Sequence, residues 1–327
     1  MKYRKFSNLG WNVSEIGLGC WQIGWCWGDV SERDAIQLLK KSLDKGINFF
    51  DTSDTYGDGR SERFLSKLLK STSEKIHVTT KLGRRIRGTN YPKGYKQAPM
   101  EEFIDRSLIN LGVECIDLLQ LHCPPSEIIE KKETYEMMDE FVNKGKIANY
   151  GVSVHKVTDA IEAIKNPNVK SIQMVFNIFR QKPSESFFEE AKKRNVAIIA
   201  RGPLASGLLT GEINKDTKFA ENDHRNYNIN GEAFDIGDTF SGVNFEKGLE
   251  AVERLKKLVP EKYSLSQLAL KWILTHDAVS VVIPGATDKF QVEMNADASN
   301  IENISNLLPN INSIYKELIK PDVHYRW

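Results

Sequence analysis

Short apolar segments alternate with amphipathic segments along almost the whole chain. Eight of the apolar segments are rich in leucine or β-branched residues, as is typical of strands buried on both faces. Between them, apolar positions recur every three or four residues, which predicts helices and therefore a parallel sheet covered by helices. The predicted strands are Ile16–Trp21, Ile47–Asp51, Ile76–Lys81, Ile116–His122, Ile147–Ser153, Ser171–Asn177, Val196–Arg201 and Val279–Pro284.

Eight strand and helix units in 327 residues favour closure into a (β/α)8 TIM barrel over an open sheet, and we expect residues 1–327 to form a single domain. Several helices begin at Ser, Thr or Asp and several end at Gly, as in Lys45-Gly46 and Lys144-Gly145. The predicted helices are Glu32–Asp44, Ser61–Leu69, Met100–Leu111, Thr134–Lys144, Val157–Lys165, Ser184–Arg194, Phe245–Leu258, Ser264–His276 and Ile301–Ile319.

Two segments depart from this repeat. Tyr3–Phe6 and Asn12–Glu15 flank Leu9-Gly10 and predict a hairpin that plugs the N-terminal end of the barrel. A polar stretch of residues 211–242, rich in Gly and Asn, precedes two consecutive helices. Loops of this length are uncommon unless functional, so the stretch is either a cover over a bound ligand or a solvated excursion.

The composition excludes several classes of partner. With 45 basic and 44 acidic residues the net charge is +1, so we expect no recruitment of nucleic acid or of an anionic membrane surface. The four cysteines form no CxxC pair and the six histidines no HExxH motif, so no metal site is expected. Without a signal-like N-terminus or a membrane-length apolar run, we expect a cytoplasmic protein that acts on a small molecule.

Candidate chemistry gathers where three neighbouring strands end, which is the face that carries the active site in TIM barrels. Asp51 ends one strand and is followed by Tyr56, while Lys81 and His122 end the next two. Each side chain alone has an ordinary structural explanation as a cap, a rim residue or a packing residue. Their joint occurrence is harder to explain in this way, because a buried lysine needs a carboxylate and a buried phenol needs a partner.

These residue types suit the reduction of a carbonyl group. A phenol is a weak acid, and a nearby ammonium such as Lys81 lowers its pKa by stabilising phenolate. Tyr56 would then donate the proton, with Asp51 keeping Lys81 charged. His122 would donate a hydrogen bond to the substrate oxygen and stabilise developing negative charge.

The same residues resemble the signature segments of the aldo-keto reductases. The likeness covers Asp51–Gly57, Thr80-Lys81 and Leu119–His122, and continues through Ile16–Trp21, Arg60–Glu62, Gly151–Ser153, Gly202–Gly211 and Ile283–Ala286. It implies a TIM barrel that reduces aldehydes or ketones to alcohols, with the same four roles for Asp51, Tyr56, Lys81 and His122.

The resemblance also implies a nicotinamide cofactor that lies extended across the mouth of the barrel. The segment Gly17–Gln22 contains GxG but lacks the third Gly and leads into no predicted helix, so a Rossmann site is not expected. The Gly-rich turn 202–207 suits phosphate oxygens. The expected contacts are Gly19, Cys20, Trp21, Asp51, Ser153, Gln173, Arg201, Gly202, Pro203, Leu204, Ser206, Gly207, Gly285, Thr287, Lys289, Gln291 and Asn295.

Three positions depart from the family pattern. Val154-His155 follows Ser153 where many members have Asn, and Arg201 stands where many stack a Tyr on the nicotinamide. Near the last strand, Thr287, Lys289 and Gln291 replace the Arg or Lys that grips the 2′-phosphate, and the loss of Arg weakens phosphate preference. NADPH is the expected cofactor and NADH is the alternative.

For the substrate pocket we expect contributions from Trp21, Trp27, Tyr56 and His122. Trp25 adds a third indole to a short segment, which indicates either packing at the barrel rim or a flat face for a sugar or an aromatic aldehyde. A second hypothesis is a cofactor-binding sensor or regulatory subunit with little turnover, as potassium-channel β subunits illustrate, although we expect no appended segment for a partner. A metal-dependent hydrolase is disfavoured, because only one predicted strand ends in His. The oligomeric state is left open.

Overall fold

The computed structural model describes residues 1–24, 30–86 and 88–327, and in this part of the chain eight parallel strands form one sheet. Each strand pairs with the next one along the chain, in the order β3 to β10. The strands are β3 (Leu18–Gly19), β4 (Phe49–Asp51), β5 (His77–Leu82), β6 (Leu118–His122), β7 (Tyr150–Ser153), β8 (Val169–Val175), β9 (Ala197–Arg201) and β10 (Val279–Val282).

Parallel bridges between the two ends of this sheet bring the barrel to near closure. Ile16 pairs with Val282, and Gly19 pairs with Gly285. The backbone N–H of Gly17 donates to the carbonyl of Val282 at 2.8 Å. A Cβ at Gly17 would lie 2.9 Å from the carbonyl oxygen of Phe49, so only glycine fits here. The Gly-Leu-Gly segment therefore serves the closure of a barrel, and the predicted (β/α)8 fold is confirmed.

The predicted N-terminal hairpin is also confirmed. Strands β1 (Tyr3–Phe6) and β2 (Trp11–Ser14) pair antiparallel, with Phe6 opposite Trp11. Phe6 and Val13 are fully buried and belong to a separate apolar cluster with side chains of β4, β6, β9 and β10. The hairpin thus closes the end of the barrel that the candidate site does not use.

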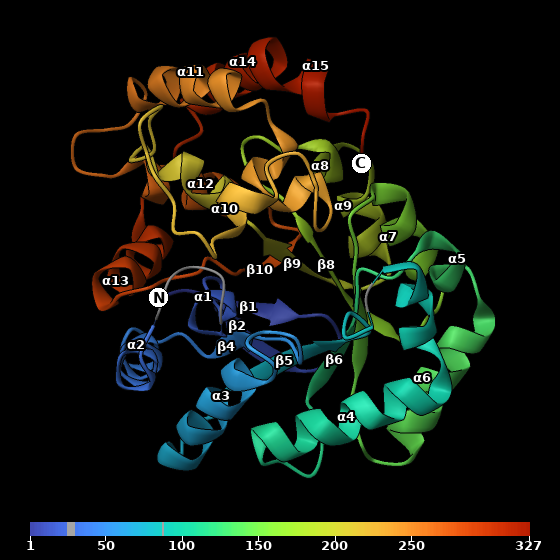
Figure 1. Cartoon of the computed structure of the whole chain (residues 1–327). Coiled ribbons are helices and arrows are strands. Elements are labelled where there is room, and N and C mark those ends of the chain that lie inside the picture. The colour runs from blue at the N-terminus through green and yellow to red at the C-terminus, as the bar shows by residue number, and fades with distance from the viewer. Residues whose placement is uncertain (25–29, 87) are drawn as a thin grey trace.

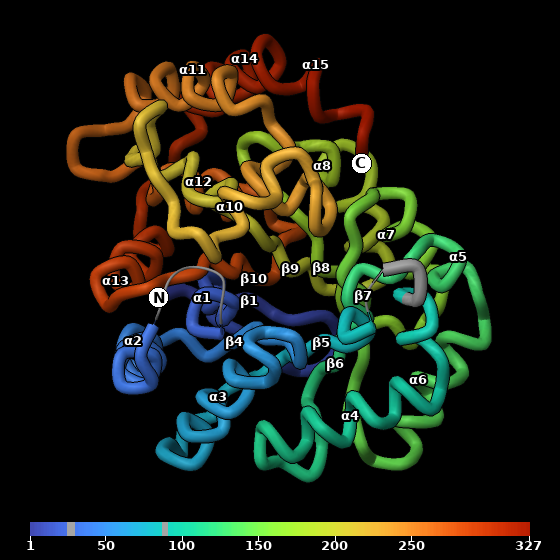
Figure 2. The backbone as a smooth tube through the Cα atoms, in the orientation of Figure 1, coloured from blue at the N-terminus to red at the C-terminus, as the bar shows by residue number. Residues whose placement is uncertain are grey.

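Helices ring the strands, and Figure 1 shows α11, α14 and α15 grouped on one side of this ring. In Figure 2 the late helix α13 lies beside the early helix α2, where Lys41 pairs with Glu293, so both ends of the chain contribute to one wall. The helices are α1 (Trp21–Gly24), α2 (Glu32–Asp44), α3 (Arg60–Ser71), α4 (Gln97–Leu111), α5 (Ser126–Ile129), α6 (Lys132–Asn143), α7 (Val157–Ala163), α8 (Lys182–Ser186), α9 (Phe188–Lys193), α10 (His224–Tyr227), α11 (Phe245–Lys256), α12 (Leu265–Leu274), α13 (Lys289–Asp297), α14 (Leu308–Ile314) and α15 (Lys320–Val323). Shorter 3-10 turns are η1 (Gly88–Tyr95), η2 (Ala205–Thr210), η3 (Ile236–Asp238), η4 (Phe240–Gly242) and η5 (Ala298–Asn300), and η6 (Tyr315–Ile319) is π-helical.

Three predicted boundaries are wrong for local physical reasons. Trp21 begins helix α1 and does not end a strand. The helix predicted over Ser184–Arg194 breaks at Phe187, whose φ of −123° leaves the helical region while its side chain is buried in the core. The helix predicted over Ile301–Ile319 begins only at Leu308, because the Asn303 side chain accepts the N–H of Ser305 in a competing turn.

The polar stretch 211–242 folds into short turns at the C-terminal end of the barrel. It contains α10, η3 and η4, and the side chain of Asn228 ties it together by accepting the N–H groups of Ala233 and Phe234 at 2.8 and 2.9 Å. Asn228 also donates to Thr239 at 3.0 Å. Across the described ranges, no helix combines the length and the apolar character needed to cross a membrane.

Candidate active site

A cavity of 1510 Å³ opens at the C-terminal ends of the strands. The stretch 211–242 contributes Phe234 and Asp238 to its wall, which favours the cover over the solvated excursion. Most of the residues predicted from the sequence line this cavity: Gly19, Trp21, Asp51, Tyr56, His122, Gln173, Arg201, Gly202, Pro203, Leu204, Ser206, Gly207, Gly285, Thr287, Gln291 and Asn295.

Lys81 is buried behind two residues that line the cavity, Asp51 and Tyr56, and joins these predicted catalytic side chains. Its Nζ donates to Oδ2 of Asp51 at 2.6 Å and contacts the hydroxyl of Tyr56 at 3.4 Å. A third bond goes to the carbonyl of Thr52 at 2.7 Å. Lys81 and Asp51 are 1% and 3% exposed, so the pair is removed from water. The predicted convergence of acid, amine and phenol is present.

Strand register and amide side chains hold the Asp51 carboxylate in place. Asp51 is the last residue of β4 and pairs with Thr79, two positions before Lys81 on β5, so both side chains turn to the same face. Its Oδ1 accepts Nε2 of Gln173 at 2.6 Å and Nε2 of Gln120 at 3.5 Å. The carboxylate is therefore fixed from three strands, β5 through Lys81, β6 through Gln120 and β8 through Gln173.

The pKa of Tyr56 stands above its ordinary value, so the expected lowering by Lys81 is present but does not set the net direction. Burial is the largest influence and raises the pKa of the phenol, and the opposing ammonium of Lys81 does not overcome it. Burial is the largest influence on Lys81 and would lower its pKa, but Asp51 and Tyr56 together outweigh burial and raise it. Tyr56 is therefore a neutral phenol beside a permanent cation.

His122 completes the group from the end of β6. Its ring meets the ring of Tyr56 edge-on with centroids 6.1 Å apart, and its Nδ1 lies 3.2 Å from the hydroxyl of Ser53. Burial, followed by the positive charge of Arg84, holds the pKa of His122 well below its usual range. The imidazole is therefore neutral and carries one ring proton.

The predicted phosphate turn has the backbone shape that binds anions. Gly202, Ala205, Ser206 and Gly207 have positive φ of 58°, 48°, 54° and 98°. Successive residues of this kind point backbone N–H groups toward one concavity, and all four residues line the cavity. The turn is held from outside, because the Ser206 hydroxyl accepts the N–H of Phe240 at 3.1 Å.

Four predicted contact residues lie elsewhere or cannot be placed. Cys20 is fully buried, and Ser153 points to Cys123 with 3.4 Å between hydroxyl and sulfur. Lys289 is exposed and its Nζ donates to Gln37 at 3.3 Å, on helix α2. Trp27, like Trp25, lies outside the described residues.

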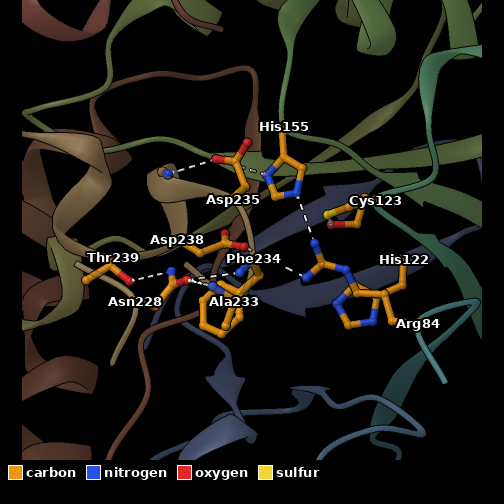
Figure 3. A network of polar contacts seen from close by, with 12 residues as sticks. Arg84, His122, Cys123, His155, Asn228, Ala233, Phe234, Asp235, Asp238 and Thr239 are labelled. Atoms are coloured by element: carbon orange, nitrogen blue, oxygen red, sulfur yellow. Dashed lines mark hydrogen bonds and ion pairs between the residues drawn. The ribbon is translucent and has the colours of Figure 1, made fainter. Parts of the chain in front are cut away.

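A group of charged residues around the expected contact Arg201 also faces the cavity, and it includes Arg84 and Asp238, which the sequence analysis did not single out (Figure 3). Arg201 and Arg84 both reach Asp238, Arg201 through a hydrogen bond and Arg84 with 3.8 Å between charged atoms. His155 lies between the two guanidiniums, 3.2 Å from each. Arg84 was detectable as a cation directly after a strand end, whereas nothing local in the sequence marks Asp238.

Comparison with known proteins agrees with the geometry. A model of the aldo/keto reductase family matches residues 15–315. Aldo-keto reductase YhdN of Bacillus subtilis is 30% identical over 99% of this chain and 96% of its own length. Aldo-keto reductase yakc [NADP(+)] of Schizosaccharomyces pombe is 27% identical over 89% of this chain and 85% of its own. The structure of glycerol dehydrogenase AKR11B4 from Gluconobacter oxydans superposes with a TM-score of 0.79 and 27% identity, covering 97% and 96% of the two chains.

Proposed function

The chain belongs to the aldo/keto reductase family, and we propose that it is an NADPH-dependent reductase that converts aldehydes or ketones to alcohols in one barrel domain, residues 1–327. The observation that carries this proposal is the position of Lys81 Nζ between Asp51 at 2.6 Å and the Tyr56 hydroxyl at 3.4 Å, beneath a large cavity. This arrangement offers a buried proton donor next to a fixed positive charge.

The described residues fit a nicotinamide dinucleotide that extends from Arg201, across the turn at residues 202–207, to Asn295. The turn at residues 202–207 presents the anion-binding concavity, and Asn295 lies at the far end, where its Nδ2 donates to the carbonyl of Gly285 at 3.3 Å. Arg201 stands at the near end, where a planar guanidinium can stack on the nicotinamide ring. The bound cofactor supplies the hydride.

The protein side chains manage the proton and the charge on the substrate oxygen. Tyr56 donates its hydroxyl proton to that oxygen, and Lys81 stabilises the phenolate that remains. Asp51 keeps Lys81 charged and oriented. His122 donates a hydrogen bond to the same oxygen and stabilises negative charge as it develops there.

Steady-state oxidation of NADPH and NADH by a panel of aldehydes and sugars tests the proposal, with the wild type compared to Tyr56→Phe. We expect turnover to fall about 10²–10⁴-fold in the variant, because the proton donor is removed. Fluorescence titration of NADPH should show unchanged binding in the same variant. Tight NADPH binding without turnover of any carbonyl compound would instead favour the sensor or regulatory role.

The cofactor preference depends on the segment after β10. The Gln291 side chain accepts the N–H of Thr287 at 2.9 Å, and Lys289 is turned toward helix α2. This segment presents no Arg to the 2′-phosphate, so we expect only a modest preference for NADPH over NADH. Lys289→Ala should leave the ratio of the two KM values almost unchanged, and a collapse of the ratio would show that Lys289 swings toward the phosphate.

A further inference from the structure

Arg84 is placed in the cavity wall by a constrained turn. It follows Gly83, where φ is 113° and a Cβ would lie 2.3 Å from the ring of Tyr95, so a residue other than glycine would displace the chain. The Arg84 side chain is 25% exposed and faces the cavity. Some of its five N–H donors are therefore open to a ligand.

The group around Arg84 has more hydrogen-bond donors than acceptors. His155 approaches Arg84 through Nε2 and Arg201 through Nδ1, each at 3.2 Å. Imidazole has one accepting nitrogen when neutral and none when protonated, and guanidinium has none, so at least one of these contacts sets donor against donor. Two more guanidinium nitrogens, Arg201 Nε and Arg180 Nη1, are buried and find no acceptor among the residues described. The carboxylates of this cluster are Asp238 and Asp235, the latter 3.8 Å from Nδ1 of His155, against the guanidiniums of Arg84, Arg180 and Arg201, so the cluster is short of one anion.

The pKa of Cys123 indicates that the electric field around this cluster is positive. Burial alone would raise the pKa of the Cys123 thiol, but nearby positive groups, first His155 and then Arg201, lower it to about 6. The guanidinium of Arg180 responds in the opposite sense, since burial and then Arg201 lower its pKa to about 9. The cluster therefore favours an anion at Cys123, whereas burial is outweighed by Asp238 and Cys123, which raise the pKa of Arg84 and Arg201 and keep both guanidiniums charged.

Arg84 lies apart from the positions proposed for the phosphates and the adenosine, and next to Arg201, the residue proposed to stack on the nicotinamide. It follows β5, whereas the phosphate turn follows β9 and the adenosine end follows β10. It is close enough to His122 to lower the pKa of that imidazole. An anionic group on Arg84 would therefore belong to the substrate and lie near the reacting carbonyl.

We propose that Arg84, supported by Arg201, binds a carboxylate of the substrate, so that the preferred substrates are aldehydes or ketones that also carry a carboxylate. The assignment rests on the proposed function and deepens it, because it names the substrate class of the same cavity. Guanidinium and carboxylate form two parallel hydrogen bonds, which would also orient the carbonyl toward His122.

Matched aldehydes test this assignment through kcat/KM. 4-Carboxybenzaldehyde is compared with 4-methylbenzaldehyde, and glyceraldehyde 3-phosphate with glyceraldehyde, in the wild type and in Arg84→Met. We expect the carboxylated aldehyde to be preferred by about tenfold or more, mainly through a lower KM, because a charge-assisted pair is gained. Arg84→Met should remove this preference and change the neutral aldehyde by less than about threefold.

Arg85→Met is the matched control, because Arg85 pairs with Asp58 outside this cavity and should leave the preference intact. A preference that survives Arg84→Met, or a preference for phosphate alone, would overturn the assignment. Calorimetric titration of benzoate separates this assignment from the reductase activity itself. Benzoate binding that Arg84→Met abolishes supports the site even if no aldehyde is turned over, and absence of binding to the wild type contradicts it.

A second, independent observation concerns a buried carboxylate on the other side of His122. Asp54 is fully buried, and its Oδ2 has no hydrogen-bond donor within the described part of the chain. Its Oδ1 lies 3.1 Å from the Ser53 hydroxyl, which lies 3.2 Å from Nδ1 of His122. Burial, followed by the negative charge of Glu62, raises the pKa of Asp54 to about 7. Protonated and ionised Asp54 are therefore both accessible near neutral pH.

The single hydroxyl proton of Ser53 couples these groups. Protonated Asp54 donates to Ser53. The Ser53 proton is then free for Nδ1 of His122, with Oγ1 of Thr55, 3.0 Å away, as the competing acceptor, and donation to Nδ1 leaves the ring proton on Nε2. Ionised Asp54 accepts the Ser53 proton, so Nδ1 must carry the ring proton and donate to Ser53. We infer that Asp54 is a positioning residue that selects the tautomer of His122, and that Nε2 can donate to the substrate oxygen only while Asp54 is protonated.

Other charges face the two titrating groups and set the background. Asp54 is also influenced by Arg85 and Arg106, which lower its pKa without overcoming burial. His122 faces Lys81, Arg84, Arg201 and His155 in addition to Ser53, and all four charged groups lower its pKa. Protonation of His122 itself is therefore not expected in the range where Asp54 titrates.

Nitrogen-15 NMR of labelled histidine gives the tautomer directly, with His122→Gln used only to assign the signal. We expect the wild type to change from Nε2–H to Nδ1–H as pH rises through about 7, and kcat/KM for reduction to fall about tenfold per unit above it. Asp54→Asn and Asp54→Ala should remove both changes, whereas Asp58→Asn, an exposed neighbour, should retain them. A pH-independent tautomer in the wild type would overturn the relay, even if reductase activity were absent.

Discussion

Two groups of buried charges lie at the same end of the barrel and are built differently. In the matched pair, the carboxylate of Asp51 and the ammonium of Lys81 are 2.6 Å apart. Their other hydrogen bonds go to side-chain amides, such as that of Gln173, and to the carbonyl of Thr52. In the unmatched group, Arg84 and Arg201 share the single carboxylate of Asp238. The pair is closed to water, whereas the guanidiniums of the unmatched group are 25% and 17% exposed into the cavity.

The difference separates a reaction centre from a binding surface. A balanced buried pair holds a charge of known sign in a fixed place, and it gains nothing from a ligand because its hydrogen bonds are already made. In an unbalanced group some guanidinium N–H groups have no acceptor, so an anion that binds there gains their hydrogen bonds and the attraction of their positive charge. Both kinds of group perturb nearby pKa values, so the balance of donors and acceptors distinguishes them better than the size of a pKa shift.

Breaking the matched pair should have the largest effect. Lys81→Met leaves the Asp51 carboxylate buried without its cation and removes the charge that stabilises phenolate at Tyr56. We expect reduction to slow by about 10²–10⁴-fold and the free energy of unfolding to fall by about 3–5 kcal/mol. Steady-state kinetics and urea denaturation measure the two effects.

The double variant Asp51→Asn with Lys81→Met is the control for this prediction. Removing both charges should recover much of the stability, because no unpaired buried charge remains, but it should not recover turnover. Equal stability of the single and double variants would mean that the two charges do not compensate each other.

Changing the unmatched group should have a smaller effect of the opposite sign on ligand binding. Asp238→Asn removes the one carboxylate that competes with a ligand for both guanidiniums. We expect benzoate to bind several-fold more tightly and Tm to fall by a few degrees, because Asp238 also anchors the stretch 211–242. Calorimetry and thermal denaturation test this, with Asp216→Asn, an exposed aspartate of the same stretch, as the control. Weaker benzoate binding would show that Asp238 orients the guanidiniums rather than neutralising them.

The sequence predicted the matched pair well because strand periodicity places it. Asp51, Lys81 and His122 end three successive apolar segments, and in-register parallel strands must bring such residues to one edge. The geometry of their contacts follows almost directly from the topology. The sign of the Tyr56 shift did not follow, because it is a balance between burial and a nearby charge that only coordinates can weigh.

The unmatched group could be predicted only in part: Arg201 was an expected contact at a strand end, whereas the carboxylate of Asp238 comes from an aperiodic segment. Asp238 lies in the polar stretch 211–242, and its position depends on Asn228 and other tertiary contacts that no local pattern encodes. Lys289 illustrates the same limit, since a long flexible side chain near the last strand turned to helix α2 and away from the cavity. Strand ends are predictable sites, whereas long loops are not.

The smallest expected effect uses Cys123 to compare the electric fields at two thiols of the chain. Thiolate attacks iodoacetamide with formation of an S–C bond and release of iodide, so the rate follows the thiolate fraction. The pKa of about 6 at Cys123 predicts a rate that falls below pH 6 and levels off above about 7. Burial, followed by Asp117, raises the pKa of Cys115, so its alkylation should keep rising above pH 9. Peptide mass spectrometry resolves the two sites.

Arg84→Met should move the Cys123 profile upward by less than about one pH unit, since Arg84 is only one of several positive groups there. An unchanged Cys123 profile in Arg84→Met would show that His155 and Arg201 alone make the field, and the surplus of positive charge would then have to be assigned to Arg201.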